Sequence, residues 1–222
     1  MPPITRGAAS HRVVAAAGLL LVAGLAGACA PRLRPLGGAP VPARLPLAEL
    51  PAGHHRVVFT WELRDPDFQL RGDGVARIAS PDSARLDFFV GSGLGGGRAV
   101  LIGQSLRVPG GDFVRRLVPT PPLLWAALGR LALPATRDTV VRVEGGVLRA
   151  DVGAPAAWRV TFRGDTLTRL DRVSGDRVVE WVERPTADRV RYRHETARRD
   201  LTLVIQRVIE EASAFDASIW RP

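Results

Sequence analysis

Few side chains in this sequence are spaced for catalysis or metal binding. His54 and His55 are adjacent, and neighbouring residues of an extended chain point to opposite sides, so this pair does not form one metal site. Ser92 has neither the Gly-x-Ser-x-Gly frame nor the following helix that a hydrolase nucleophile needs. Asp65 and Asp67 flank a proline and are typical of a turn. The sequence therefore predicts no catalytic residue, no metal site and no cofactor.

The glycine-rich residues 91–97 contain the spacing of a dinucleotide-binding loop. Such a loop is followed by a helix whose N-terminus binds the phosphates. Here residues 98–102 alternate like a strand, and the Gly-Lys-Ser/Thr of a phosphate-binding P-loop is missing. Both nucleotide-binding interpretations are excluded.

Cys29 is the single cysteine, and its surroundings predict a different chemistry. It ends an apolar run over residues 13–29 that follows Arg6 and Arg12. A basic start, an apolar core and small residues before a cleavage site are typical of a secretory signal. The small residues before Cys29 resemble the lipobox of bacterial lipoproteins, in which the thiol is diacylated, although Ala26 stands where leucine is usual. An uncleaved anchor is the alternative, but about seventeen apolar residues are marginal for a bilayer.

Cleavage before Cys29 would remove residues 1–28 as a lipoprotein signal peptide and leave 194 residues, enough for one domain with a sizeable core. All 31 basic side chains are arginines, and the net charge of +9 becomes +7 without the two in the signal. A basic exported protein favours an anionic lipid or an acidic partner and not nucleic acid. The late arginines at 189, 191, 193, 198 and 199 form a basic face. This face is either an ordinary solvated strand face or a surface that attracts such partners.

After His55 apolar and polar residues alternate, which indicates β-strands. We expect about eleven strands in two blocks, roughly 56–108 and 138–209, with short turns that make neighbouring strands antiparallel. Each strand has one apolar face, and little else in the chain could cover it. The sequence therefore predicts a mainly β fold, in which a single antiparallel, strongly curved sheet forms an unclosed half β-barrel.

Two segments break the strand pattern. Residues 121–131 start with two prolines and have apolar residues at helical spacing, which predicts one helix that covers the apolar face as a lid. Residues 29–54 are rich in proline, which predicts an extended tether between the lipid and a half-barrel domain over residues 55–222. We expect the C-terminal residues 215–220 to pack on an edge of the sheet.

The order of sheet, helix and sheet after a lipobox resembles the LolA/LolB superfamily of bacterial lipoprotein carriers and receptors. Residues 72–78, residues 85–95 and the proline-rich start of the helix at 123–129 carry the likeness. The lipid anchor favours the LolB-like outer-membrane receptor over the soluble LolA-like carrier. The resemblance implies a non-enzymatic protein on the periplasmic face of the outer membrane, with a soluble periplasmic LolA-like carrier as a partner. Related half-barrels serve other lipids, so the fold alone does not give the guest.

The resemblance also implies that Leu94, in the glycine-rich loop, inserts into the membrane. Burying a leucine in lipid contributes roughly 1.5–3 kcal/mol. The alternative is an ordinary hairpin whose leucine folds back. The candidates for an acyl-chain cavity are apolar residues of the strands and the helix, although aromatic residues of this kind more often form plain core than line a cavity: Phe59, Trp61, Phe88, Leu124, Trp125, Leu128, Trp158 and Phe162.

The sequence thus predicts an outer-membrane lipoprotein that binds acyl chains of lipoproteins or lipids in an apolar cavity and transfers them to the membrane. The alternative is a structural or protein-interaction lipoprotein on the same fold, with a filled core and no lipid transfer. The volume of the cavity distinguishes the two. An exported hydrolase would need a cluster of polar side chains in that cavity.

Overall fold

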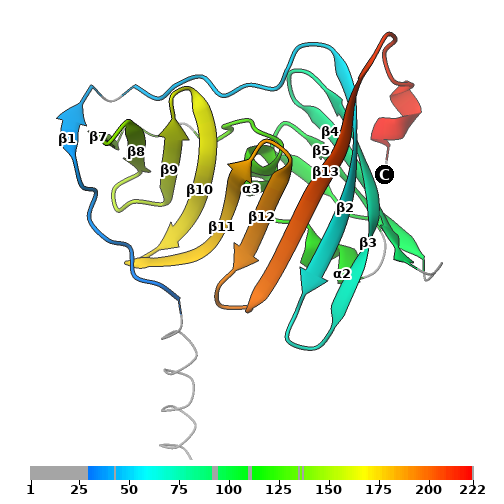
Figure 1. The fold of residues 1–222 in the computed structure, drawn as a ribbon, viewed down its shortest axis with the longest axis horizontal. Helices are drawn as coiled ribbons and strands as arrows, with labels where there is room; N and C mark the ends of the chain where they lie inside the picture. The colour runs from blue at the N-terminus through cyan, green and yellow to red at the C-terminus, as the bar shows by residue number, and fades with distance from the viewer. Residues whose placement is uncertain are drawn as a thin grey trace, which may run out of the picture.

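The alternation of apolar and polar residues is realised as strands of one sheet. The computed structural model describes residues 30–42, 44–91, 95–109, 112–134, 136 and 138–221. Within them the chain forms a thirteen-stranded antiparallel sheet (Figure 1). The strands are β1 (Ala39–Val41), β2 (His54–Arg64), β3 (Gln69–Ala79), β4 (Ser83–Val90), β5 (Gly96–Ile102), β6 (Ser105–Arg107), β7 (Thr139–Glu144), β8 (Val147–Val152), β9 (Trp158–Arg163), β10 (Thr166–Ser174), β11 (Arg177–Thr186), β12 (Arg189–His194) and β13 (Arg199–Glu211).

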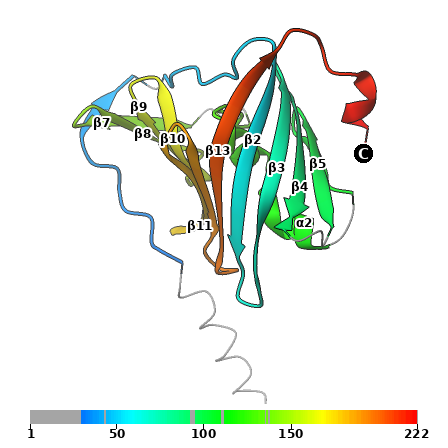
Figure 2. The ribbon, with the colours of Figure 1, turned by 45° about the vertical axis from the view of Figure 1, so that its right-hand side comes forward.

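The strand order β1-β7-β8-β9-β10-β11-β12-β13-β2-β3-β4-β5-β6 leaves β1 and β6 as the two edges. The two predicted blocks of strands join where β13 pairs with β2. The sheet curves strongly but does not close (Figures 1 and 2). The predicted unclosed antiparallel sheet is therefore confirmed, and β1 and β6, of three residues each, are the strands beyond the expected eleven.

Two short helices lie on one side of the sheet, which we call the inner face (Figure 1). They are α2 (Asp112–Leu117) and α3 (Pro121–Ala127). The strand before them, β6, and the strand after them, β7, lie at or next to opposite edges of the sheet. The connection at residues 108–138, which we call the lid segment, must therefore cross the inner face to join them.

The helix predicted over residues 121–131 is shorter in the structure, and α2 was not predicted. Gly129 adopts a φ of +97°, a left-handed conformation that ends an α-helix, so α3 stops at Ala127. Thr120 precedes the helix, and prolines occupy its first two positions, where their missing N–H groups cost nothing.

The apolar phase of each strand faces inward. On β2 the buried residues Val57, Phe59, Trp61 and Leu63 alternate with more exposed ones. The opposite phase forms ion pairs on the outer face: Arg85 binds Asp87 through two nitrogens, at 2.7 and 3.0 Å. This one-sided burial is what the alternation in the sequence predicts.

Two glycines allow close packing on the inner face. A Cβ on Gly74 would lie 2.3 Å from the ring of Phe59, the residue opposite it on β2. A Cβ on Gly97 would lie 2.0 Å from a methyl group of Val114 in α2. These glycines therefore let an aromatic ring and a helix rest directly on the sheet backbone.

The segment predicted as a free tether lies along the sheet instead. Ala30 is only 3% exposed, and its carbonyl accepts a hydrogen bond of 2.8 Å from Arg177. Residues 39–41 form β1 on β7, and Leu50 is buried in the core. Prolines do not prevent such edge pairing, because an edge strand leaves half of its backbone groups unpaired anyway.

The C-terminus covers the outer face and not an edge as predicted. The 3-10 helix η3 (Ala217–Trp220) lies outside the curved sheet near β4 (Figure 2), and Arg85 donates a 3.1 Å hydrogen bond to the carbonyl of Ile219. Phe215 packs edge-on against His54 and Trp220. Among the described residues, no helix is both long and apolar enough to span a bilayer.

Candidate functional site

All eight residues predicted to line a cavity lie in one apolar cluster between the sheet and the lid segment. Six of them are at most 3% exposed, whereas Leu128 and Trp158 are partly exposed at its margin. They come from β2, β4, β9, α3 and the residue after α3: Phe59, Trp61, Phe88, Trp158, Phe162, Leu124, Trp125 and Leu128. The structure brings them together, and lipid binding by them stays a prediction.

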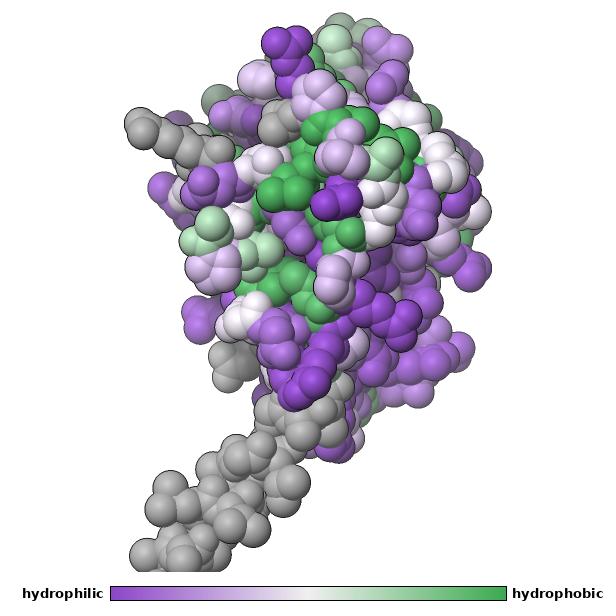
Figure 3. Space-filling view, turned by 90° about the vertical axis from the view of Figure 1, so that its left-hand side faces the viewer, coloured by the Kyte–Doolittle hydropathy of each residue, from purple (hydrophilic) through white to green (hydrophobic). Residues whose placement is uncertain are grey.

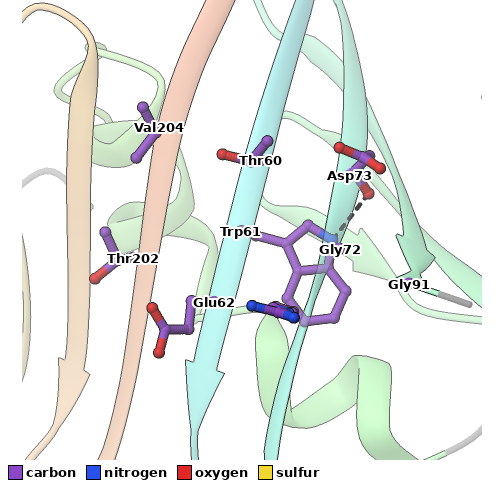
Figure 4. A pocket seen from close by; sticks show the side chains of 9 residues that line it. Thr60, Trp61, Glu62, Gly72, Asp73, Gly91, Thr202 and Val204 are labelled. Atoms are coloured by element: carbon purple, nitrogen blue, oxygen red, sulfur yellow. Dashed lines mark hydrogen bonds between the residues drawn. The ribbon is translucent and has the colours of Figure 1, made fainter.

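The aromatic rings of β2 and β4 are fixed in place. Phe88 packs edge-on against Phe59 and Trp61, with ring centroids 5.8 and 6.1 Å apart. The indole of Trp61 lies next to Gly72, and its N–H donates a 2.8 Å hydrogen bond to the carbonyl of Asp73 (Figure 4). The groove drawn in Figure 4, of about 430 Å³, lies beside this indole and is also lined by Thr60, Glu62 and Thr202. These rings therefore form a rigid wall of the cluster.

The space left between the lid segment and the sheet is very small. A cavity of about 20 Å³ remains there, room for about one water molecule. Sites for small ligands measure roughly 300–1,000 Å³. The inner face is thus filled in this state, and a guest could enter only if the lid segment moved. The cavity is lined by Leu86, Phe88, Leu117, Val118, Pro119, Leu124, Ala127, Val190, Tyr192, Leu201 and Leu203.

Apolar packing and a small number of polar bonds hold α3 against the sheet. The indole N–H of Trp125 donates to the carbonyl of Gly103 at 2.7 Å. Arg184, on β11, donates to the carbonyl of Ala127 at 2.6 Å, at the end of the helix. Farther along, the backbone N–H of Leu131 donates to the carbonyl of Ala48 at 2.9 Å. These bonds are separate points that fasten the C-terminal part of the lid segment.

Arg116 joins α2 to the hairpin between β2 and β3 through ion pairs with Asp65 and Asp67, both at 3.5 Å. Arg116 of α2 lies 3.5 Å from Asp65, whose other oxygen accepts a 3.0 Å hydrogen bond from Arg199. Burial acts to raise the pKa of Asp65, but the hydrogen bonds from Arg199 and the Asp67 backbone, with the charges of Arg199 and Arg116, outweigh it. The pKa of Asp65 therefore lies below its usual 3.8.

A buried polar cluster stands on the inner face near the cavity. The hydroxyl of Tyr192 donates to a carboxylate oxygen of Glu180 at 2.8 Å, and Arg172 binds the other oxygen. Burial, followed by the charge of Glu180, raises the pKa of Tyr192, so the hydroxyl stays a donor. Tyr192 is the one residue with a polar side chain among the described residues that line the cavity. The cluster satisfies its own members and presents no nucleophile beside the cavity.

The part of the inner face formed by β7, β8 and β9 is covered less completely. The helix α3 packs chiefly against β10, β11 and β12, and α2 against β5. Leu148 and Trp158 remain partly exposed beside the buried Phe162. Figure 3, which looks at the molecule from the side of β1 and β7, shows apolar side chains gathered in the middle of this face with polar ones around them.

The structure describes only some of the other residues that the sequence analysis singled out. Cys29 and Leu94 lie outside the described residues. Among the late arginines, 191, 193 and 199 form ion pairs with Asp200, Glu195 and Asp65. Within the described part of the chain, no group of three or more His, Cys, Asp or Glu side chains could hold a metal ion.

Sequence reasoning missed the contribution of α2 to the site. Val114 and Leu117 are fully buried, and Val118 nearly so. Their spacing of three and four residues is that of one helix face, so the signal was present in the sequence. Six residues are too few for such a pattern to stand out.

No family model matches the chain, and no curated protein sequence matches it. Solved structures do match. A DUF1329 family protein from Desulfovibrio piger is 10% identical, with a TM-score of 0.45, over 76% of this chain and 90% of its own. A LolA superfamily protein from Nitrosomonas europaea is 10% identical, with a TM-score of 0.45, over 79% and 93%. A domain assigned to outer membrane lipoprotein sorting, from Vibrio parahaemolyticus, is 8% identical, with a TM-score of 0.37, over 75% and 89%.

The superfamily that the sequence resembles is therefore also found among the matching structures, at low identity. At these identities and TM-scores the matches say nothing of a ligand, a partner or an activity.

Proposed function

We propose that this protein is a lipid-anchored, non-enzymatic receptor on the periplasmic face of the outer membrane. It takes up acyl chains of lipoproteins or lipids beneath α2 and α3, from a soluble carrier, and passes them to the membrane. The observation that supports this is the inner face. It is the apolar side of an unclosed sheet, and it is covered by two short helices on a segment that must cross it from edge to edge.

Uptake would exchange the lid segment for the guest. An acyl chain would make the same kind of apolar contact with the sheet as the buried side chains of α3 make now. These include Leu123, Leu124 and Trp125. Replacing these side chains with an acyl chain therefore changes the buried apolar area little. The free energy changes little as well, because each Å² of buried apolar area contributes about 25 cal/mol. A guest can shift such an equilibrium by its own binding, so loading needs no energy source. The separate polar bonds of α3 set how readily the segment opens.

The anchor and the predicted insertion loop would face the same membrane. Ala30 is bound at the start of β11, beside the end of β10. In an antiparallel sheet of this order, β4 runs in the same direction as β10, so both strands end on the same side of the sheet. Cys29 precedes Ala30 and Leu94 follows β4 by four residues, so a lipid and a loop leucine would both be carried at that end of the sheet, although five strands separate β10 from β4.

The filled inner face favours a second candidate. A cavity of about 20 Å³ is what a structural or protein-interaction lipoprotein without lipid transfer would have. The two candidates differ in one respect that can be measured, which is whether the lid segment must open.

A disulfide that locks the lid segment tests the proposal. Leu131 and Ala48 share a backbone hydrogen bond of 2.9 Å, so their backbones lie side by side, and Ala48→Cys and Leu131→Cys are combined in a Cys29→Ser background. We expect the oxidised protein to lose uptake of a dipalmitoylated peptide and reductant to restore it. Thr60→Cys with Val204→Cys, a directly opposed pair on β2 and β13, is the matched control and should keep uptake in both states.

Native mass spectrometry of the loaded protein gives the readout. Uptake that persists in the oxidised Ala48–Leu131 variant would show that the lid segment need not open there. A wild-type protein that takes up no peptide would favour the filled-core candidate.

A further inference from the structure

Two arginines lie at the C-terminal end of α3. Arg184 donates one hydrogen bond to the carbonyl of Ala127, and its guanidinium lies beside Gly129, 3.4 Å from where a Cβ would stand. The guanidinium of Arg130, the next residue, stacks over the ring of Trp125 at 4.8 Å from its centroid. Both positive charges therefore lie at the end of the helix, at the margin of the apolar cluster.

Neither charge is balanced within the described part of the chain, where Arg130 and Arg184 have no ion pair. Other poorly exposed arginines do: Arg159, with 12% of its side chain exposed, binds Asp151 through two nitrogens at 2.7 and 2.8 Å. Burial lowers the pKa of Arg184. Burying a charge is costly unless it is paired, so two such neighbours need an explanation.

The guanidinium of Arg130 also lacks a hydrogen-bond acceptor for one of its nitrogens. Its Nη1 is buried and has no hydrogen-bond acceptor. Among the described residues, it is the one buried side-chain nitrogen or oxygen without a hydrogen-bond partner. A guanidinium has five N–H donors, and Arg184 uses one of them on Ala127. Donors therefore remain on both side chains for an anionic acceptor.

We propose that Arg130 and Arg184 bind the anionic head group of a lipid whose acyl chains take the place of α2 and α3 on the inner face. This proposal rests on the proposed function and adds the chemical class of the guest. The planar guanidinium matches phosphate in a two-point geometry, and the apolar cluster next to it suits the chains of the same molecule. The preferred guest is thus a phospholipid with a net negative charge, and not the uncharged diacylglyceryl group of a lipoprotein.

Photo-crosslinking of the full chain tests the head-group preference. The protein is reconstituted in phosphatidylcholine vesicles that contain either phosphatidylglycerol or diacylglycerol, each with the same photoactivatable acyl chains. Mass spectrometry of peptides then measures labelling of the lid segment and of β12, β13 and β2. We expect phosphatidylglycerol to label them about tenfold more than diacylglycerol does, a difference of about 1.4 kcal/mol.

Variants assign the preference to the two arginines. Arg130→Gln and Arg184→Gln should each reduce the excess for phosphatidylglycerol and leave diacylglycerol labelling unchanged. Arg207→Gln, which removes an exposed arginine without an ion pair on β13, is the control and should keep the excess. Arg130→Gln alone decides the matter if Arg184→Gln unfolds, because Arg130 makes no hydrogen bond to the helix through its side chain.

The outcomes separate the two proposals. Equal labelling by both lipids in the unaltered protein would overturn the head-group assignment while leaving acyl-chain binding in place. No labelling of the inner face by either lipid would overturn the proposed function and the head-group assignment together. An excess that survives Arg130→Gln, or one that is lost to the same extent in Arg207→Gln, would overturn the assignment to these residues.

Discussion

The two ends of the sheet cover their apolar faces in different ways. On β2 to β5, aromatic rings rest on glycines, and α2 packs onto Gly97. On β7 to β9, no helix packs closely, and Leu148 and Trp158 stay partly exposed. The first end is a rigid wall, whereas the second keeps apolar surface within reach. An incoming acyl chain would therefore meet the least resistance at β7 to β9.

The largest difference between the two ends should appear when one aromatic ring is removed from each. Phe88→Ala deletes a fully buried ring that contacts both Phe59 and Trp61, so we expect a loss of about 3–5 kcal/mol in the free energy of unfolding. Trp158→Ala should cost less, about 1–2 kcal/mol, because part of that ring already lies in water. Urea unfolding measures both, and equal losses would contradict the comparison.

A second prediction concerns the contact between α2 and β5. Gly97→Ala places a methyl group 2.0 Å from the Val114 side chain, so α2 must shift, at a cost of about 1–3 kcal/mol. Val114→Ala in the same chain makes room, and we expect the double variant to be more stable than the sum of the two single effects. Thermal unfolding of the four proteins gives the coupling energy. Purely additive effects would show that α2 does not rest on Gly97.

The smallest effect is expected from acid. The pKa of Asp65 is lowered in the folded protein, so its stabilisation is complete above the unfolded value of 3.8 and is lost as the pH falls through the folded value. Hydrogen exchange at residues 112–117 should therefore speed up below about pH 3.8, as Arg116 loses Asp65, the more buried of its two partners.

Asp65→Asn is the control for that titration. It should raise exchange in α2 already at pH 6 and remove much of the pH dependence below it. Exchange equal to that of the unaltered protein at pH 6 would mean that the ion pair with Arg116 does not hold α2.

The parts of the fold that short-range patterns encode could be predicted. The phase of Phe59, Trp61 and Phe88 follows from alternation, and the structure places all three on the inner face. The end of α3 could not be fixed, because Leu128 and Leu131 continue a helical spacing after Gly129 has turned the chain. The tether was predicted from its prolines and few large side chains, and the partners that bind residues 30–41 come from distant strands.

The candidate site shows the same division. The apolar side chains could be named in advance because burial follows from apolar phase. Arg130 and Arg184 could not, since they are 54 positions apart in the sequence and neither has a local pattern. Only the packing of α3 on β11 brings both to one end of the helix.

The sequence by itself determined that this protein is built from successive antiparallel hairpins with one apolar face, because hairpin pairing and alternation are local properties of the chain. The tertiary structure decided that β13 pairs with β2, that the lid segment must therefore cross the inner face, and that the space beneath it is filled. Those features depend on contacts between residues far apart in the chain, and their loop-closure entropy is balanced only when the whole sheet is assembled.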